Sequence, residues 1–273
     1  MTSIISRWFG AMQRNPAAPI RLFSFHYAGG SAAIFRSWRQ LLPNWVELWP
    51  VQFPGRGQRI SERPETSIER LVGSMLPDLL PIFKERPFCL FGHSMGATVA
   101  FELARKLFCE HGSGPCILFV SGRRAPNLSR RKHSAYKLSD PDFVDELRRL
   151  NGTPREVLDS PELMQLLLPV IKADFEAIET YRYMPGEPLA CPIVAFAGLH
   201  DGEVRMEEME PWRSFTSADF SLQTFEGDHF FIHSHEALLI QEITTELRLL
   251  LQKPSWAEQQ LCMDGLQQHS VQR

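Results

Sequence analysis

The chain lacks the features of membrane-spanning, secreted and nucleic-acid-binding proteins. Its 273 residues contain no run of about 18 apolar residues, the length that a membrane span needs. The arm at residues 1–19 holds no apolar stretch of signal-peptide length, because Arg7 and Arg14 interrupt it. Basic and acidic residues nearly balance, at 29 and 32, so neither nucleic acid nor an anionic membrane surface is favoured as a partner.

Cysteine is also scarce. The five cysteines are odd in number and include no Cys-X-X-Cys pair. We therefore expect no disulfide framework, no metal site and a cytoplasmic location. Nucleotide-binding motifs are missing too, because Gly29 and Gly30 belong neither to a Gly-X-Gly-X-X-Gly pattern nor to a loop ending in Lys-Ser or Lys-Thr. We expect no cofactor.

Strand-like apolar runs alternate with helical patterns along most of the chain. This order favours an α/β fold with a mostly parallel central sheet and helices on both faces. The expected strands are Ile20 to Phe25, Val46 to Phe53, Phe88 to Phe91, Cys116 to Val120, Pro192 to Phe196 and Phe220 to Phe225. The expected helices of this core are Phe35 to Leu42, Ile68 to Leu80, Thr98 to Lys106 and Ala237 to Leu251.

The length suits one domain, at residues 20–252. Residues 1–19 are expected to form a short amphipathic helix or a loose arm. Residues 253–273 are polar and rich in glutamine, so we expect a flexible tail.

The segment Gly92-His93-Ser94-Met95-Gly96 follows an apolar strand and runs directly into a helical pattern. That is the context of a nucleophile elbow, where a serine stands on a tight turn between strand and helix. The turn leaves no room for a Cβ two residues to either side, and glycine occupies both positions. We therefore predict that Ser94 is a nucleophile rather than a solvent-exposed turn residue.

A serine hydroxyl needs a base within hydrogen-bond reach and an acid that orients this base. Asp201 and His229 each follow an expected strand, so both should lie with Ser94 at the carboxyl edge of the sheet. The order serine, acid, histidine predicts Asp201 as the acid and His229 as the base. The rival acids and bases nearby are Glu203, Asp228, His233 and His235.

Backbone N–H groups must stabilise the oxyanion that forms during acyl transfer. We expect one from Met95, the residue after the nucleophile. The other should come from the loop that follows the first strand, where Ala28 is the predicted donor and Gly29 the alternative.

Between about residues 122 and 188 the alternation breaks, and helices replace strands. Ser139 and Pro141 begin one helix, which stops at Asn151. A second begins at Ser160 and should kink near Pro169. Because these helices have broad apolar faces to cover, we expect a lid over the active site rather than a subdomain without substrate contact.

Basic residues gather at the start of this insertion. We interpret them as a solvated basic face, with a docking patch for an acidic partner or a phosphate as the alternative. They are Arg123, Arg124, Arg130, Arg131 and Lys132.

With these residues in place, the chain resembles the type II thioesterases, stand-alone editing hydrolases of nonribosomal peptide and polyketide synthase systems. The resemblance spans residues 21–250. The motifs that carry it include His26-Tyr27-Ala28-Gly29-Gly30-Ser31, Pro54-Gly55-Arg56, Phe91-Gly92-His93-Ser94-Met95-Gly96, Ala173-Asp174-Phe175 and Gly227-Asp228-His229-Phe230-Phe231.

The resemblance implies an α/β-hydrolase fold and hydrolysis of acyl thioesters on the phosphopantetheine arm of acyl or peptidyl carrier proteins. It assigns Ser94 as nucleophile, Asp201 as acid and His229 as base, with Ala28 and Met95 as oxyanion donors. We expect a monomer. A carboxylesterase or lipase that acts on free esters shares this fold and triad and stays an alternative. A binding module without activity is disfavoured, because all three triad residues are present.

Overall fold

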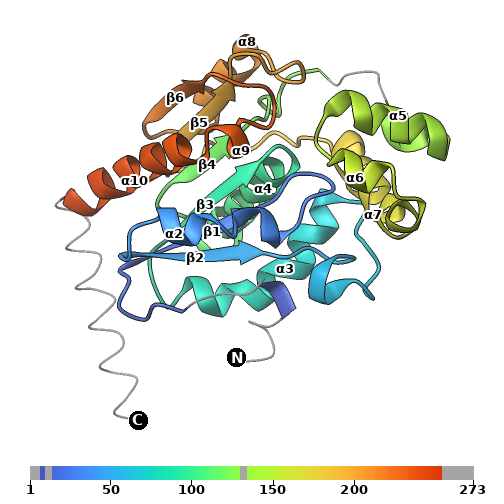
Figure 1. The fold of residues 1–273 in the computed structure, drawn as a ribbon. Coiled ribbons are helices and arrows are strands. Elements are labelled where there is room, and N and C mark those ends of the chain that lie inside the picture. The colour runs from blue at the N-terminus through green and yellow to red at the C-terminus, as the bar shows by residue number, and fades with distance from the viewer. Residues whose placement is uncertain (1–6, 10–13, 130–133, 254–273) are drawn as a thin grey trace.

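The computed structural model describes residues 7–9, 14–129 and 134–253. Its centre is a six-stranded sheet in the order β2-β1-β3-β4-β5-β6, and each neighbouring pair of these strands is parallel (Figure 1). The strands are β1 (Ile20–Phe25), β2 (Val46–Val51), β3 (Phe88–His93), β4 (Leu118–Ser121), β5 (Ile193–Gly198) and β6 (Phe220–Phe225). The predicted α/β architecture is confirmed.

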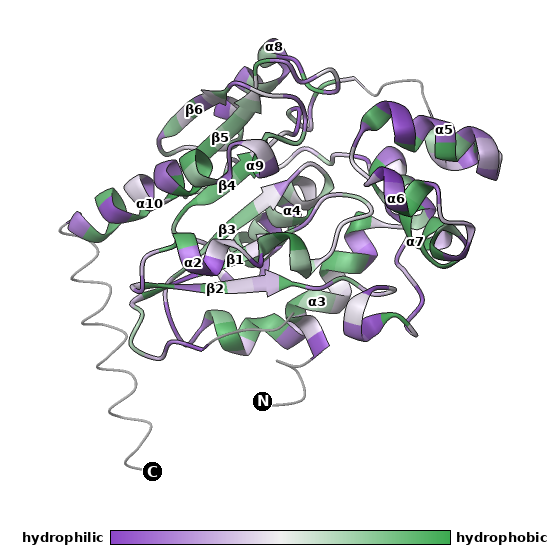
Figure 2. Cartoon of the chain, viewed as in Figure 1, coloured by the Kyte–Doolittle hydropathy of each residue, from purple (hydrophilic) through white to green (hydrophobic). Residues whose placement is uncertain are grey.

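Burial explains why these strands are continuous apolar runs. Strands β1 to β5 are buried along their whole length, because helices cover both faces of the sheet. The edge strand β6 is only partly buried. Figure 2 shows β4 and β5 in hydrophobic colours, whereas the outer helix α10 (Glu236–Gln252) alternates between hydrophobic and hydrophilic.

Helices form a layer on each face of the sheet. On one face lie α3 (Ile68–Phe83) and α4 (Met95–His111), whose apolar side chains belong to the same buried cluster as Phe23 and Trp49. On the other lie α2 (Trp38–Leu41), α9 (Phe231–Ser234) and α10, which pack around Leu22 and Phe91. The remaining short segments are α8 (Met206–Met209) and the 3-10 turns Ala32–Phe35, Gly57–Arg59, Ala135–Lys137 and Glu210–Phe215.

Between β4 and β5 the chain forms a helical insertion of α5 (Asp140–Leu150), α6 (Arg155–Leu158) and α7 (Pro161–Thr180). The side chains of Ser139 and Ser160 cap α5 and α7, and Asn151, with a φ of 57°, ends α5. Helix α7 continues through Pro169, and the four-residue α6 was not predicted. The insertion has a small core of its own, formed by Phe143, Leu147, Leu158, Met164 and Ile171.

Part of the N-terminal arm belongs to the core. Trp8 and Phe9 are buried, and Phe9 bridges to Val51 at the end of β2. The Trp8 indole N–H donates to Asp78 at 2.6 Å. The polar tail from residue 254 on lies outside the described residues. Among the helices that the structure describes, none has the length and apolar character to cross a membrane.

Two glycines allow α4 to lie close to the ends of β3 and β1. A Cβ on Gly92 would lie 2.1 Å from the carbonyl oxygen of Gly96, and a Cβ on Gly96 would lie 2.1 Å from the carbonyl oxygen of Phe25. Both neighbours are backbone, so neither can move aside. The steric demand inferred from the sequence at these two positions is therefore present in the structure.

We expect Gly96→Ala to lower the free energy of unfolding by about 3 kcal/mol or more, because the new Cβ overlaps backbone. Gly73→Ala is the matched control, since a Cβ at this position in α3 meets nothing within 4 Å. That change should be neutral or stabilise the chain by up to about 1 kcal/mol. Urea unfolding of both variants measures the difference, and equal stabilities would contradict the packing argument.

Candidate active site

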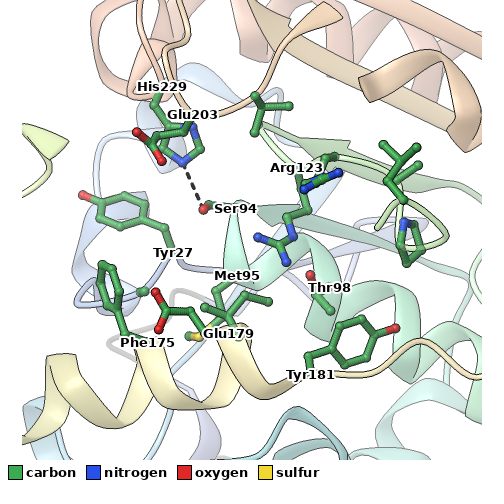
Figure 3. Close-up of a pocket in the computed structure, with 18 of the residues that line it drawn as sticks. Tyr27, Ser94, Met95, Thr98, Arg123, Phe175, Glu179, Tyr181, Glu203 and His229 are labelled. Carbon is green, nitrogen blue, oxygen red and sulfur yellow. Dashed lines mark hydrogen bonds between the residues drawn. The ribbon is translucent and has the colours of Figure 1, made fainter. Parts of the chain in front are cut away.

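Ser94 lies on the turn between β3 and α4 and has a φ of 54°. Such a value is unusual for a residue with a side chain and marks a strained backbone. The Ser94 N–H donates to the carbonyl of Ser121 in β4 at 2.8 Å, which ties the turn to the neighbouring strand. The strained turn thus holds the hydroxyl at the carboxyl edge of the sheet (Figure 3).

The structure brings the three predicted triad residues into one line of hydrogen bonds. Nε2 of His229 lies 3.0 Å from Oγ of Ser94, and Nδ1 of His229 lies 2.8 Å from Oδ2 of Asp201. The carboxylate only accepts, so Nδ1 carries the proton and Nε2 is left to accept from the serine. This is the geometry that a serine nucleophile and its base require.

Asp201 is fixed by the loop in which it lies. Its Oδ1 accepts from the N–H groups of Glu203 and Val204 at 2.7 and 2.9 Å, while Oδ2 faces His229. The side chain is 1% exposed. Both carboxylate oxygens are therefore used, and the acid is held rigidly against the imidazole.

The rival acids and bases have other partners. Glu203 pairs with Arg149 at 3.2 Å, and Asp228 accepts from the N–H of Phe230 at 2.8 Å. His233 bonds the hydroxyl of Tyr27 at 2.9 Å, and His235 bonds Ser234 at 2.9 Å. Each of the four residues is thus held by a partner other than Ser94, whereas His229 and Asp201 form the line of hydrogen bonds to the serine.

The loop after β1 forms a tight turn beside Ser94. The Gly30 N–H donates to the carbonyl of Tyr27 at 3.0 Å, and Gly29 has a φ of 78°, as at the third position of a type II β-turn. The Gly29 N–H donates to Oδ2 of Asp174 at 2.8 Å. Because that N–H is occupied, the structure favours Ala28 over Gly29 as the predicted oxyanion donor.

Two buried histidines flank the site, and sequence reasoning gave neither a role. Burial lowers the pKa of His93 well below its ordinary value, and repulsion from His229 and His233 acts in the same direction. Burial and the Arg56 charge likewise lower the pKa of His26. Both rings are therefore neutral near pH 7. A neutral His93, with its ring centroid 5.2 Å from that of His229, does not oppose positive charge on His229 during a reaction.

Ser94 opens into a cavity of about 980 Å³. Its lining includes Met95 and Phe101 of α4, Tyr27, and Leu150 and Phe175 of the insertion. Figure 3 shows Phe175 and Glu179 reaching into this cavity from α7. The insertion therefore contributes residues to the wall around Ser94, as a lid would.

Two of the five basic residues predicted to form a solvated face lie within the described part of the chain. Arg123 lines the cavity, and Arg124 pairs with Glu208 at 3.3 Å and is largely buried. For Arg124 the expected solvated face is wrong, because Glu208 pairs with it and the side chain is largely buried. Arg123 is partly buried in the wall of the cavity. Arg130, Arg131 and Lys132 lie outside the described residues.

Comparison with known proteins gives the family. The model of the thioesterase domain family matches residues 20–247. A structure of the type II thioesterase BorB from the borrelidin biosynthetic cluster superposes with a TM-score of 0.81 and 38% identity, covering 88% of this chain and 97% of that one. These matches confirm the predicted α/β-hydrolase fold.

Two curated relatives align over nearly their full length. Gramicidin S biosynthesis protein GrsT of Aneurinibacillus migulanus is 40% identical, over 91% of this chain and 97% of its own. Linear gramicidin dehydrogenase LgrE of Brevibacillus parabrevis is 42% identical, over 90% and 94%. The second name is that of a dehydrogenase, but the present chain has no nucleotide-binding glycine motif. The chain belongs to the thioesterase family and is a thioester hydrolase, as its resemblance to the type II thioesterases of nonribosomal peptide and polyketide systems predicts.

Proposed function

We propose that this chain is a stand-alone editing thioesterase that removes acyl groups from the phosphopantetheine arm of carrier proteins in a nonribosomal peptide or polyketide system. The observation that carries the proposal is the pair of hydrogen bonds that joins Ser94, His229 and Asp201. They lie at a cavity to whose lining the insertion contributes residues. Membership of the thioesterase family and the biosynthetic setting named for GrsT and BorB support it.

In the first half-reaction, Ser94 Oγ attacks the thioester carbonyl carbon while His229 Nε2 accepts the hydroxyl proton. Asp201 stabilises the resulting imidazolium through Nδ1. The carbonyl oxygen becomes an oxyanion, which accepts from the N–H groups of Ala28 and Met95. The carbon–sulfur bond then breaks, the pantetheine thiol leaves with a proton from His229, and the acyl group stays on Ser94.

In the second half-reaction, water attacks the acyl carbon while His229 Nε2 accepts a proton from it. The bond between the acyl carbon and Ser94 Oγ then breaks, His229 returns the proton to Oγ, and the free acid leaves. A thiol is a better leaving group than an alcohol and needs less help from an acid. No cofactor enters these steps, because the phosphopantetheine arm belongs to the partner.

The cavity suits an enzyme that removes varied acyl groups. It is wide, and its lining mixes apolar residues such as Phe101 and Trp212 with charged ones such as Arg123 and Glu179. A hydrophobic pocket distinguishes acyl chains by only about 1–3 kcal/mol per methylene group. Weak discrimination lets an editor free a carrier from many wrong acyl groups, and we propose that the insertion acts as the lid over them.

The direct test is intact-mass spectrometry of an acetyl-loaded carrier protein. We expect the wild-type chain to remove the acetyl mass and Ser94→Ala to leave it in place, because no nucleophile remains. Circular dichroism of Ser94→Ala should match the wild type. Deacylation by Ser94→Ala near the wild-type rate would contradict the role of Ser94.

The role of His229 as the base can be tested against His233, a histidine in the same segment. His229→Ala should lower kcat on the carrier thioester by about 10⁴-fold or more. His233→Ala should lower it by less than about tenfold, because His233 contacts Tyr27 and not Ser94. Similar losses in the two variants would place the base elsewhere.

The acid is tested in the same way. Asp201→Asn should lower kcat by about 10⁴-fold, because an asparagine no longer holds the tautomer of His229 in which Nε2 accepts a proton. Asp228→Asn should change kcat little. Stopped-flow or steady-state rates on one acyl-carrier decide between the two, and a larger loss for Asp228→Asn would contradict the assignment.

A further inference from the structure

A buried ion pair joins the insertion to the main domain. Arg56, which follows β2, donates from Nη1 and Nη2 to the two carboxylate oxygens of Asp174 in α7, at 2.6 and 2.8 Å. Each side chain is 5% exposed. The residues lie 118 positions apart in the sequence. The reaction described above uses neither of them.

Both partners also hold the turn that carries Ala28. Oδ2 of Asp174 accepts from the Gly29 N–H at 2.8 Å, and Nη1 of Arg56 donates to the Gly30 carbonyl at 3.3 Å. The side chain of Ile171, one helical turn before Asp174, lies against Gly29, 3.4 Å from where a Cβ would stand. Helix α7 thus contacts the turn through the Asp174 carboxylate and through the apolar side chain of Ile171.

His26 also holds this turn, through a hydrogen bond to the Tyr27 carbonyl. Its Nδ1 lies 2.8 Å from the Tyr27 carbonyl oxygen, which can only accept, so Nδ1 carries the proton. The Tyr27 carbonyl therefore receives hydrogen bonds from His26 and from Gly30. In a trans peptide the N–H points away from the carbonyl. Fixing the Tyr27 carbonyl consequently fixes the direction of the Ala28 N–H.

Stability alone does not explain this pair. Taking two charges out of water costs free energy that their attraction only partly returns, and apolar residues of similar volume often do as well. The pair instead fixes the position of its two side chains, because two parallel hydrogen bonds allow a guanidinium and a carboxylate only one relative orientation. Oxyanion donors are effective only when they are held in place before the reaction.

We propose that Asp174, held by Arg56, is a positioning residue that fixes the oxyanion turn at Tyr27–Gly30. Because Phe175, its neighbour in α7, lines the cavity, the helix that walls the substrate site also sets the position of the oxyanion donor. The inference rests on the proposed acyl-transfer function and deepens it.

The test compares Asp174→Ala with Glu47→Ala. Glu47 is also a buried carboxylate that pairs with an arginine, Arg21 at 2.9 Å, but it lies at the amino end of β2, away from Ser94. Steady-state kinetics with a p-nitrophenyl ester give kcat and KM. Binding of an alkylboronic acid reports the oxyanion site, since Ser94 adds to boron to form a tetrahedral anion that resembles the intermediate.

We expect Asp174→Ala to lower kcat by about 10- to 100-fold, with KM within about threefold of the wild type, and to weaken boronic acid binding by a similar factor as kcat. Glu47→Ala should leave both readouts within about threefold, whatever its loss of thermal stability. A kcat loss in Asp174→Ala without weaker boronic acid binding, or equal losses in both variants, would overturn the proposal.

Arg56→Lys provides a second measurement in case Asp174→Ala does not fold. Lysine keeps the positive charge but cannot make two parallel hydrogen bonds, so kcat and boronic acid affinity should fall together by about three- to tenfold. An unchanged boronic acid affinity in a folded Arg56→Lys would overturn the proposal. The proposed function is tested separately, because its failure would appear as a wild-type chain that leaves carrier thioesters intact.

Discussion

The close approach of helix α4 to strands β3 and β1 is the constraint on which the site depends. Gly92 and Gly96 let backbone meet backbone at distances that no Cβ allows. The resulting turn forces Ser94 to a positive φ of 54° and lifts its hydroxyl above the edge of the sheet. The base and acid need only follow β6 and β5 to reach the same edge. Because all the strands are parallel, residues that follow different strands lie close together at the same edge of the sheet.

The charged groups around this turn favour positive charge on His229. Asp201 is the buried carboxylate that faces His229, and its second oxygen is satisfied by backbone N–H groups. The neighbouring His93 is kept neutral by burial. Positive charge on His229 therefore meets a fixed anion on one side and no competing cation in His93. The buried carboxylate of Asp174 pairs with Arg56 and accepts from the Gly29 N–H of the oxyanion turn instead.

Local signals in the sequence predicted much of this arrangement. Strands β1 and β6 and helix α5 have the expected limits, because apolar runs and a Ser139 cap mark their ends. Ser94, Asp201 and His229 come together as expected because each follows a strand. What the sequence could not show are contacts between distant segments. Trp8 packs in the core, and Arg56 meets Asp174, through tertiary contacts that leave no periodic pattern.

Whether Ser94 acts on carrier-bound thioesters is decided by comparing two substrates that carry the same acyl group. The value of kcat/KM is determined for an acetyl thioester on a carrier protein and for a simple acetyl oxygen ester. We predict a higher kcat/KM for the carrier thioester, because the proposed partner brings its acyl arm to the cavity at Ser94. An oxygen ester cleaved as fast or faster would contradict it and identify a hydrolase of free esters.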